Sequence, residues 1–311
     1  MDPVRAIADA VLYEGYLLWP YRRSATKNQR RWTFGGVYPR AHSERHPDDR
    51  SVMRTECLLE GDGDVEVDVR FLHVVARQVW RDGEPVDELV AGGERHLSWD
   101  EAVERELTLR LPGRAPIAIA AGTEEEPLPG GAVVRSWEAL EGAVDVRLES
   151  IAAGVRRIAV EVVNTTPWEA AEREDALRRT FCSTHAALRT TAGRFISQTD
   201  PPARLRAAAG ECRNEGAWPV LVDADDRTVL ASAIILEDHP RIAPESPGDL
   251  FDGGEIDQML VLNILSLTDA EKAEMRDSDP RAREILERTE ALSEDELMRL
   301  HGAIREFGMA R

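Results

Sequence analysis

The alternation of apolar and charged residues predicts strands through much of the first half of the chain. From Val65 to Phe71 every second residue is apolar and the residues between them are charged, the pattern of a strand with one buried face. Further strands are predicted at 53–60, 103–111, 115–121, 143–149 and 155–163, separated by turns rich in Gly, Pro and Asp. A short helix is expected near 99–105. Several short strands at such intervals favour an antiparallel β-sandwich-like region.

Helical patterns frame this region. Asp2-Pro3 is a helix start signal, and apolar residues recur at helical spacing from Val4 to Leu12. After residue 164, Thr166 and Glu169 form a capping box with a proline between them, which predicts a helix through Arg179.

The last third of the chain combines a β-hairpin with a helical tail. Apolar runs at 218–222 and 228–236, joined by the turn sequence DADDR, predict the hairpin. Helices are predicted between 255 and 307, with two capping boxes and an Asp-Pro pair as start signals. The chain is therefore expected to be an α+β protein. A domain of residues 1–165 carries the short helix and the sandwich-like region, and residues 166–311 form a mixed helical region. The two are expected either as separate domains or as two packed layers of one body.

Composition limits the class of protein. At 311 residues, with 42% hydrophobic and 31% charged residues, the chain is expected to be soluble and globular. A net charge of −19 argues against phosphate-backbone binding, so nucleic acid is not expected as a partner. No apolar run approaches the length of a membrane span. Three cysteines that cannot all pair, and the absence of a secretion-like start, favour a cytoplasmic setting.

One stretch, Val11 to Pro39, concentrates aromatic and basic side chains and is called the aromatic–basic segment. It holds all four tyrosines of the protein, with Trp19, Trp32 and a run of Arg and Lys between them. Aromatic rings bury large areas, and guanidinium groups stack on rings or bind carboxylates. The segment is therefore interpreted either as one around which the rest packs or as one that binds a partner.

Trp, Tyr and Arg are the side chains that most often anchor protein interfaces. The predicted partner-contact residues come from this segment and from the loop between Pro244 and Asp257. They are Tyr13, Tyr16, Trp19, Tyr21, Arg22, Arg23, Arg30, Arg31, Trp32, Tyr38, Asp249, Phe251, Asp252 and Glu255. From Glu237 onward acidic residues outnumber basic ones about two to one. The basic and acidic regions are thus expected either to bind a partner or to face each other within the molecule.

Candidate metal ligands are few. Cys182 with His185, and His42 with His46, have suitable spacing. A zinc site needs three or four protein ligands, and neither pair has a second pair at familiar spacing. A buried cysteine is also more often a core residue than a nucleophile. No metal and no cofactor is predicted.

The acidic loop carries the alternative of an enzyme. Its carboxylates are Asp249, Asp252, Glu255 and Asp257. At the start of a helix such groups favour the positive end of the helix dipole. The alternative function is a metal-dependent hydrolase that uses Asp249, Asp252 and Glu255 together with His239. Since no phosphate-binding loop, dinucleotide-binding turn or nucleophile elbow occurs, an enzyme is the less favoured class.

Three stretches resemble a bacterial family of actinobacterial type, encoded alongside the structural and maturation genes of NiFe hydrogenases. They are YEGYLLWPYRRSATKNQRRWTFGGVYP at 13–39, ILEDHPRIAPESPGDLFDGGEIDQMLVLNILSLTDAEKAEMR at 235–276, and RAREILERTE at 281–290. The resemblance is collinear and spans both ends of the chain. It implies a role in the assembly, maturation or stability of a cytoplasmic hydrogenase, but it implies no activity and no catalytic residue.

The sequence therefore favours an accessory protein that acts through protein–protein contacts and has no catalysis of its own. Its expected partner is a hydrogenase subunit or a maturation factor. The alternatives are the metal-dependent hydrolase and a structural subunit of a larger assembly.

Overall fold

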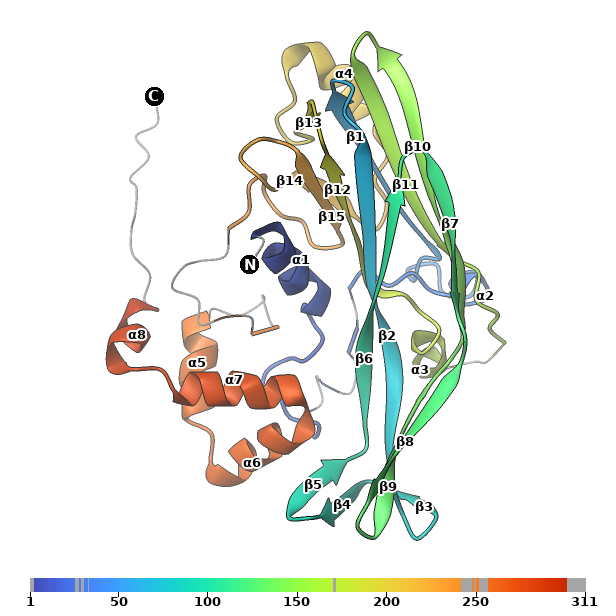
Figure 1. The fold of residues 1–311 in the computed structure, drawn as a ribbon. Helices are drawn as coiled ribbons and strands as arrows, with labels where there is room; N and C mark the ends of the chain where they lie inside the picture. The colour runs from blue at the N-terminus through green and yellow to red at the C-terminus, as the bar shows by residue number, and fades with distance from the viewer. Residues whose placement is uncertain are drawn as a thin grey trace. The chain divides into compact units, whose positions relative to one another are not determined.

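The computed structural model describes residues 3–25, 28, 31–32, 34–169, 172–241, 248, 250–251 and 257–300. The chain divides into two compact units (Figure 1). The first unit consists of Met1–Tyr13 and Trp32–Pro240, and the second of Glu14–Arg31 and Arg241–Arg311. The chain thus passes three times between the units, and the second unit combines segments from near the two ends of the sequence.

A five-stranded antiparallel sheet forms one part of the first unit (Figure 1). Its spatial order is β13 (Arg194–Ile196), β1 (Val52–Glu60), β11 (Val155–Asn164), β10 (Leu140–Ala152) and β7 (Gly113–Ile119). β1 and β11 pair from Val52↔Val163 to Glu60↔Val155. The strands predicted at 53–60, 115–121, 143–149 and 155–163 all belong to this sheet.

An eight-stranded sheet is organised around β2 (Val65–Arg81). Its main order is β14 (Trp218–Leu221), β15 (Thr228–Ser232), β12 (Cys182–Thr190), β2, β9 (Gly131–Trp137) and β8 (Gly122–Leu128). β3 (Glu84–Val86) and β6 (Trp99–Arg110) also pair with β2, and β4 (Glu88–Ala91) pairs with β5 (Glu94–Leu97). The predicted hairpin is confirmed as β14–β15.

The largest apolar cluster draws buried side chains from both sheets. Val67 of β2, Val160 of β11 and Leu188 of β12 are among its members, and each is fully buried. Alternate residues of a strand share a face, so the period-two pattern places one apolar face of each sheet in this cluster. Removing that surface from water is the main stabilising term of the first unit.

The predicted α+β class is confirmed, but the helix expected near 99–105 is wrong. Those residues begin β6, which pairs with β2 from Arg77↔Trp99 to Glu66↔Arg110. A partner strand of that length satisfies the backbone hydrogen bonds of β6 throughout, and this outweighs local helix propensity.

The helix expected from Thr166 is wrong over its first part. The Thr166 hydroxyl accepts a hydrogen bond from the Glu141 backbone N–H (2.9 Å) and donates one to the Glu141 carbonyl (3.1 Å). Because the side chain is bound to β10, it does not cap a helix. Helix α3 comprises only Arg173–Leu177.

The division into units also differs from the boundary expected at residue 165. β12, which follows that position, pairs with β2, which precedes it, from Cys182↔Leu72 to Thr190↔Val65. The short helices α2 (Arg40–Ser43), η2 (Ala203–Leu205) and α4 (Arg206–Gly210) lie in the same unit. Residues on both sides of the expected boundary therefore share one sheet and one core.

The predicted N-terminal helix is confirmed as α1 (Pro3–Tyr13), which is bound to the eight-stranded sheet by charged groups. Arg70 of β2 is 2% exposed, and its Nη2 atom lies 2.6 Å from Asp9 and 3.0 Å from Glu104. The Tyr13 hydroxyl donates to Glu104 at 2.8 Å. Because a buried charge is costly unless paired, these two carboxylates allow Arg70 to occupy a buried position.

Among the described residues, four helices follow the acidic loop in the second unit, and residues 301–307 of the predicted tail lie outside the described residues. The four helices are α5 (Asp257–Leu265), α6 (Asp269–Ser278), α7 (Pro280–Glu290) and α8 (Glu294–Arg299). The predicted start signals are confirmed, since Thr268 and Ser293 form capping boxes and the Asp279 side chain caps α7. In the described part of the chain, no helix has the length and apolar character needed to cross a membrane.

We expect Leu188→Ala to lower the free energy of unfolding by about 2–5 kcal/mol, because it leaves a cavity in the shared cluster. Leu188 is 0% exposed there. Urea-induced unfolding followed by circular dichroism measures the change. Val103→Ala is the matched control, since Val103 on β6 is 43% exposed and its loss should cost less than about 1 kcal/mol. Equal effects of the two substitutions would contradict the assignment of the core.

Candidate functional site

The aromatic–basic segment is divided between the two units. Tyr13, Trp32 and Tyr38 belong to the first unit, and the residues from Tyr16 to Arg31 belong to the second. Its predicted contact residues therefore have two separate environments.

Tyr16 lies in the interior of the second unit, where it is 3% exposed. Its hydroxyl donates to Asp279 Oδ2 at 2.8 Å. The guanidinium groups of Arg31 and Arg281 lie 5.4 and 5.7 Å from its ring centroid, and Phe251 packs edge-on at 6.3 Å. Burial, reinforced by the Asp279 carboxylate, raises the pKa of Tyr16 well above its usual value, so the hydroxyl stays protonated and donates.

Tyr21 has a similar role. It is fully buried, and its hydroxyl donates to the Leu250 carbonyl at 2.6 Å. Trp19, which is half-buried, packs edge-on against it with the ring centroids 6.0 Å apart. These contacts join the early segment to the residues just before α5.

Two basic residues of the segment, Arg22 and Arg23, contact carboxylate and hydroxyl groups of α6. Arg22 Nη1 lies 3.0 Å from Glu271 and 3.9 Å from Glu274. The Arg23 backbone N–H donates to the Ser278 hydroxyl at 3.2 Å. Arg22 thus faces acidic residues of α6 within the second unit, and the binding of a partner by this region stays a prediction.

The remaining predicted residues of the second unit fall into two groups. Arg31 is 5% exposed and donates from Nη1 to the Tyr16 carbonyl at 3.4 Å, and Phe251 is 9% exposed. The others, Arg30, Asp249, Asp252 and Glu255, lie outside the described residues. The carboxylates on which the hydrolase alternative depends therefore have no described geometry.

In the first unit, Tyr13, Trp32 and Tyr38 are each 5% exposed or less. The Tyr38 hydroxyl accepts a hydrogen bond from Arg173 Nη2 at 2.8 Å, and its ring stacks on that of His42 at 5.0 Å. The structure thus gives the buried residues a role in packing, and their role in binding a partner stays a prediction.

A surface hollow adjoins the end of the segment. Phe34 is 45% exposed, and the next two residues, Gly35 and Gly36, border a cavity of about 220 Å³. The whole cavity belongs to the first unit and is called the Gly35 hollow. Its other walls include Tyr38, Asp48, Asp49, Arg50, Gly216 and Trp218.

Glycine is required at both positions of the doublet. Gly35 has a φ of +59°, and a Cβ atom there would lie 3.0 Å from the Cβ of Ala233. A Cβ at Gly36 would lie 2.6 Å from the Tyr38 ring. The two glycines thus allow the backbone to approach both the strand region after β15 and the ring that lines the hollow.

Backbone hydrogen bonds fix the same stretch to the strands. Val37 forms a two-way bridge with Phe181, with N–O distances of 3.0 and 3.1 Å, and the Tyr38 N–H donates to the Arg50 carbonyl at 2.7 Å. The buried Asn164 amide donates to the carbonyls of Val37 and Arg179, at 2.8 Å each. The hollow therefore has walls of fixed backbone.

Its exposed chemistry consists of one indole ring and a set of charges. Trp218 is 39% exposed. Asp49 Oδ2 lies 2.9 Å from His42 Nε2, whereas Asp48 is exposed and forms no ion pair with the described residues. Arg50 supplies a positive charge at the same cavity. Such a surface can bind another molecule, but it contains no arrangement of nucleophile and base.

The residues of the two candidate metal-ligand pairs lie packed against other side chains. The rings of His42 and His46 stack with centroids 4.4 Å apart, and His42 is fully buried. Cys182 and His185 are also fully buried. Burial raises the pKa of Cys182 to about 12 and lowers that of His185 to about 4, so the first is a thiol and the second a neutral imidazole. Among the described residues, no three His, Cys, Asp or Glu side chains are placed to hold a metal.

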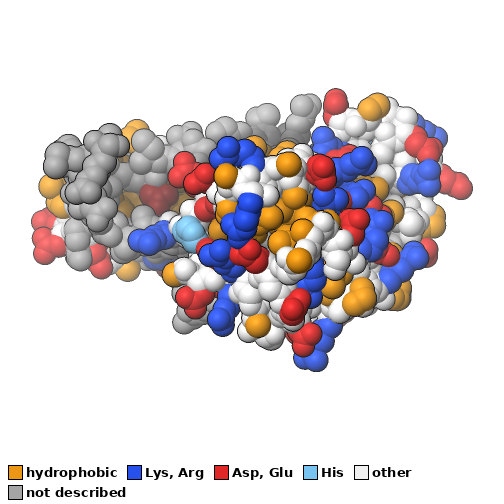
Figure 2. All heavy atoms as spheres, turned by 90° about the horizontal axis from the view of Figure 1, so that it is seen from above, with side chains coloured by type: hydrophobic (Ala, Val, Ile, Leu, Met, Phe, Trp, Pro, Cys, Tyr) orange, Lys and Arg blue, Asp and Glu red, His pale blue; other side chains and the backbone are white. Residues whose placement is uncertain are grey.

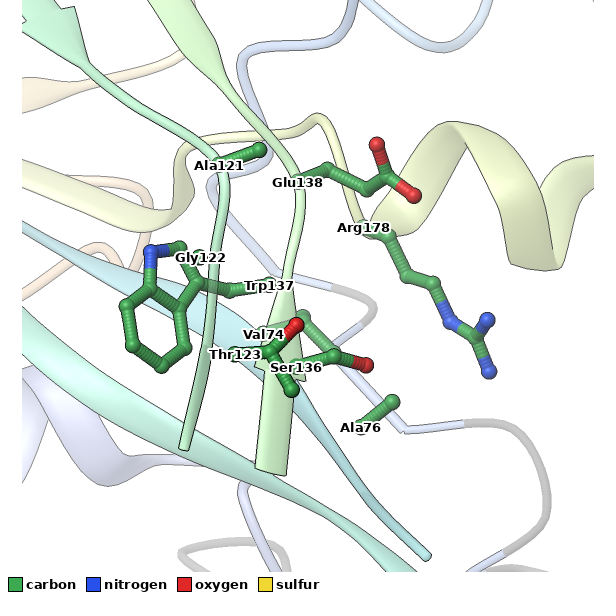
Figure 3. Close-up of a pocket in the computed structure, with 9 residues that line it drawn as sticks. All are labelled: Val74, Ala76, Ala121, Gly122, Thr123, Ser136, Trp137, Glu138 and Arg178. Atoms are coloured by element: carbon green, nitrogen blue, oxygen red, sulfur yellow. The ribbon is translucent and has the colours of Figure 1, made fainter. Parts of the chain in front are cut away.

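A second hollow of about 330 Å³ lies among β2, β8 and β9 (Figure 3). Figure 3 shows the side chains of Thr123 and Ser136 close together, with those of Glu138 and Arg178 further to the right. Arg178 lies 3.7 Å from Asp100, so its charge is already balanced at the rim. Trp137 also lines this hollow, and its indole N–H donates to the Ala120 carbonyl at 3.0 Å.

A third hollow, of about 930 Å³, is lined by four arginines and three glutamates. Arg157 lies 2.9 Å from Glu211 and 3.5 Å from Glu149, and Arg54 donates to Glu56. The same interleaving of basic and acidic side chains is visible on the face in Figure 2. No tryptophan lines this hollow, whereas the 39% exposed Trp218 lines the Gly35 hollow, which is therefore the better candidate site.

No protein-family model matches this chain, and no curated protein matches it. The candidate site therefore depends on the geometry of the molecule alone.

Of the residues that line the Gly35 hollow, only Tyr38 is predicted from the sequence as a contact residue. Asp48 and Asp49 are adjacent in the sequence, but Trp218 lies far from them and meets them only in the fold. The glycine doublet after an aromatic run is the one local signal that a close backbone approach occurs there.

We expect Tyr16→Phe to destabilise the second unit by about 1.5–3 kcal/mol, because it removes a hydrogen bond to the charged Asp279. Hydrogen exchange of the α7 amides, read by mass spectrometry, should become faster in proportion. Tyr21→Phe is the matched control, since it removes a hydrogen bond to a neutral carbonyl and should cost about 0.5–1.5 kcal/mol. Unchanged exchange in α7 would show that Tyr16 does not join the two segments.

Stability is expected to fall as the pH is lowered from about 6.5 toward 5, partly because of His185. Its folded pKa, about 4, lies below the ordinary value of 6.5, so the unfolded chain takes up the proton first. The contribution of neutral His185 to stability is therefore fully present above about pH 6.5. Below that pH the free energy of unfolding decreases by about 1 kcal/mol per pH unit. Urea unfolding at several pH values measures this slope. His185→Gln should reduce it, whereas an identical slope in the variant would show that His185 does not contribute.

Proposed function

We propose that this protein is an accessory protein in the assembly, maturation or stability of a cytoplasmic NiFe hydrogenase. It acts through protein–protein contacts and has no catalysis of its own. The sequence resemblance supports the class of partner, and the Gly35 hollow supports the mode of action. The observation that carries the proposal is a 39% exposed tryptophan, Trp218, beside a hollow with a fixed backbone.

An exposed tryptophan is unusual on a surface that meets only water, whereas Trp is enriched among the residues that dominate binding energy at interfaces. Trp218 begins β14, an edge strand of the eight-stranded sheet, and Pro219 follows it. Proline has no N–H to offer, so it hinders another strand from joining this edge. At this edge, binding through the side chains of the hollow is therefore favoured over the addition of a strand from another protein.

We infer a sandwich-like arrangement for the two sheets that carry this surface. The support is the single apolar cluster to which both sheets contribute. Such a scaffold is rigid, and its loops and strand ends are the usual place for binding residues.

A tagged copy of the full chain, purified from its native host, is expected to recover hydrogenase subunits or maturation factors identified by mass spectrometry. Trp218→Ala should reduce that recovery at least about fivefold, because it removes the ring from the proposed contact. Val103→Ala, which removes a similarly exposed apolar side chain elsewhere, should leave recovery unchanged. Recovery of no hydrogenase component, or equal recovery with all three proteins, would reject the proposal.

A further inference from the structure

The size of the Gly35 hollow indicates what can enter it. Its volume is about 220 Å³, smaller than the roughly 300–1,000 Å³ of pockets that enclose drug-sized ligands. Its mouth is open to solvent beside the 39% exposed Trp218. A hollow of this kind suits one side chain that projects from the surface of another protein.

The lining indicates the chemistry of that side chain. An exposed indole ring attracts cations through its negative face. The surrounding part of the chain already contains such pairs. Arg173 lies 5.8 Å from the Tyr38 ring centroid, and Arg45 lies 5.3 Å from that of Trp168. Trp218, by contrast, has 39% of its surface available to a second molecule.

Asp48 offers a carboxylate at the hollow, and the net negative charge of the protein favours the approach of a basic side chain. Two carboxylates, Asp48 and Asp49, line it against one guanidinium, that of Arg50. Asp49 lies 2.9 Å from His42 and 4.0 Å from the Arg173 guanidinium, whereas Asp48 and Arg50 form no ion pair with the described residues. The protein as a whole carries a net charge of −19, and such a field raises the rate at which a basic surface approaches.

We propose that the Gly35 hollow binds a basic side chain, arginine or lysine, of a partner protein, with Trp218 against its cation and Asp48 as its counter-ion. This inference rests on the proposed contact role and adds the chemistry of the partner surface. Arginine suits the site best, because its planar guanidinium can stack on a ring and still donate to a carboxylate.

Peptide binding to the purified full chain tests the proposal. The probe is a fluorescein-labelled peptide, Gly-Ser-Arg-Gly-Arg-Ser-Gly, and its binding is measured by fluorescence anisotropy at low ionic strength. Two comparison peptides carry citrulline or leucine in place of arginine. Citrulline keeps the shape of arginine without its charge, so the arginine peptide should bind at least about tenfold more tightly than either comparison.

Variants locate the binding site. Asp48→Asn should weaken binding of the arginine peptide about fivefold, whereas Asp62→Asn should change it less than twofold. Both remove one negative charge, but Asp62 lies in the β1–β2 turn and does not line the hollow. Trp218→Ala should weaken binding about tenfold and Trp218→Phe by less, because phenylalanine retains a ring. Circular dichroism confirms that each variant is folded.

Equal affinity for the arginine and citrulline peptides, tighter binding of the leucine peptide, or equal effects of Asp48→Asn and Asp62→Asn would overturn the inference. These outcomes are independent of the purification from the native host. Recovery of hydrogenase components without arginine-peptide binding would leave the proposed function standing and reject the basic side chain. Arginine-specific binding without such recovery would retain this site and reject the hydrogenase.

Discussion

The first unit depends on the pairing of one long strand, β2, with four others. This strand pairs with β12 from Val65 to Leu72 and with β6 from Glu66 to Arg77, and its last residues pair with β9 and β3. A single strand thus fixes the register of segments drawn from most of the unit. A shift by one residue would turn every side chain of β2 to the opposite face. It would move Val67 and Val69 out of the core and displace Arg70 from its carboxylates. The apolar pattern and the buried arginine therefore specify the same register.

Much of this architecture follows from the sequence, because alternation is a local signal. The strands of the five-stranded sheet, the hairpin and the capped helices of the tail all carry short-range patterns. The errors occur where a distant partner overrides the local preference. Residues 99–105 are strand because β2 is there to pair with them, and Thr166 binds β10 instead of capping a helix. Neither partner can be read from the residues nearby.

The aromatic–basic segment shows the same limit at the level of function. Its composition marks it correctly as an anchoring segment, but composition does not say what it anchors. Tyr16 and Tyr21 reach Asp279 and Leu250, more than two hundred positions further along the sequence. Most residues that line the Gly35 hollow lie between 35 and 53, but Trp218 comes from a distant part of the sequence, and its exposure arises only from the fold. Of the candidate site, the sequence could supply the glycine doublet and Tyr38, but not the charges or the second ring.

The division of the segment has a consequence for binding. Its second-unit part is held by intramolecular contacts, whereas the stretch from Phe34 to Tyr38 borders a hollow whose backbone is already fixed by Asn164 and the Val37–Phe181 bridge. Ordering loops and side chains is one of the costs that reduce affinity. Because this backbone is already ordered, a partner that binds the hollow loses little binding free energy to backbone ordering. A few contacts therefore suffice for a specific interaction. The same rigidity explains the glycines. A side chain at Gly35 would clash with Ala233, and one at Gly36 would clash with the Tyr38 ring. To relieve either clash the backbone would have to shift, and the shift would break its contacts with the strands or change the wall of the hollow.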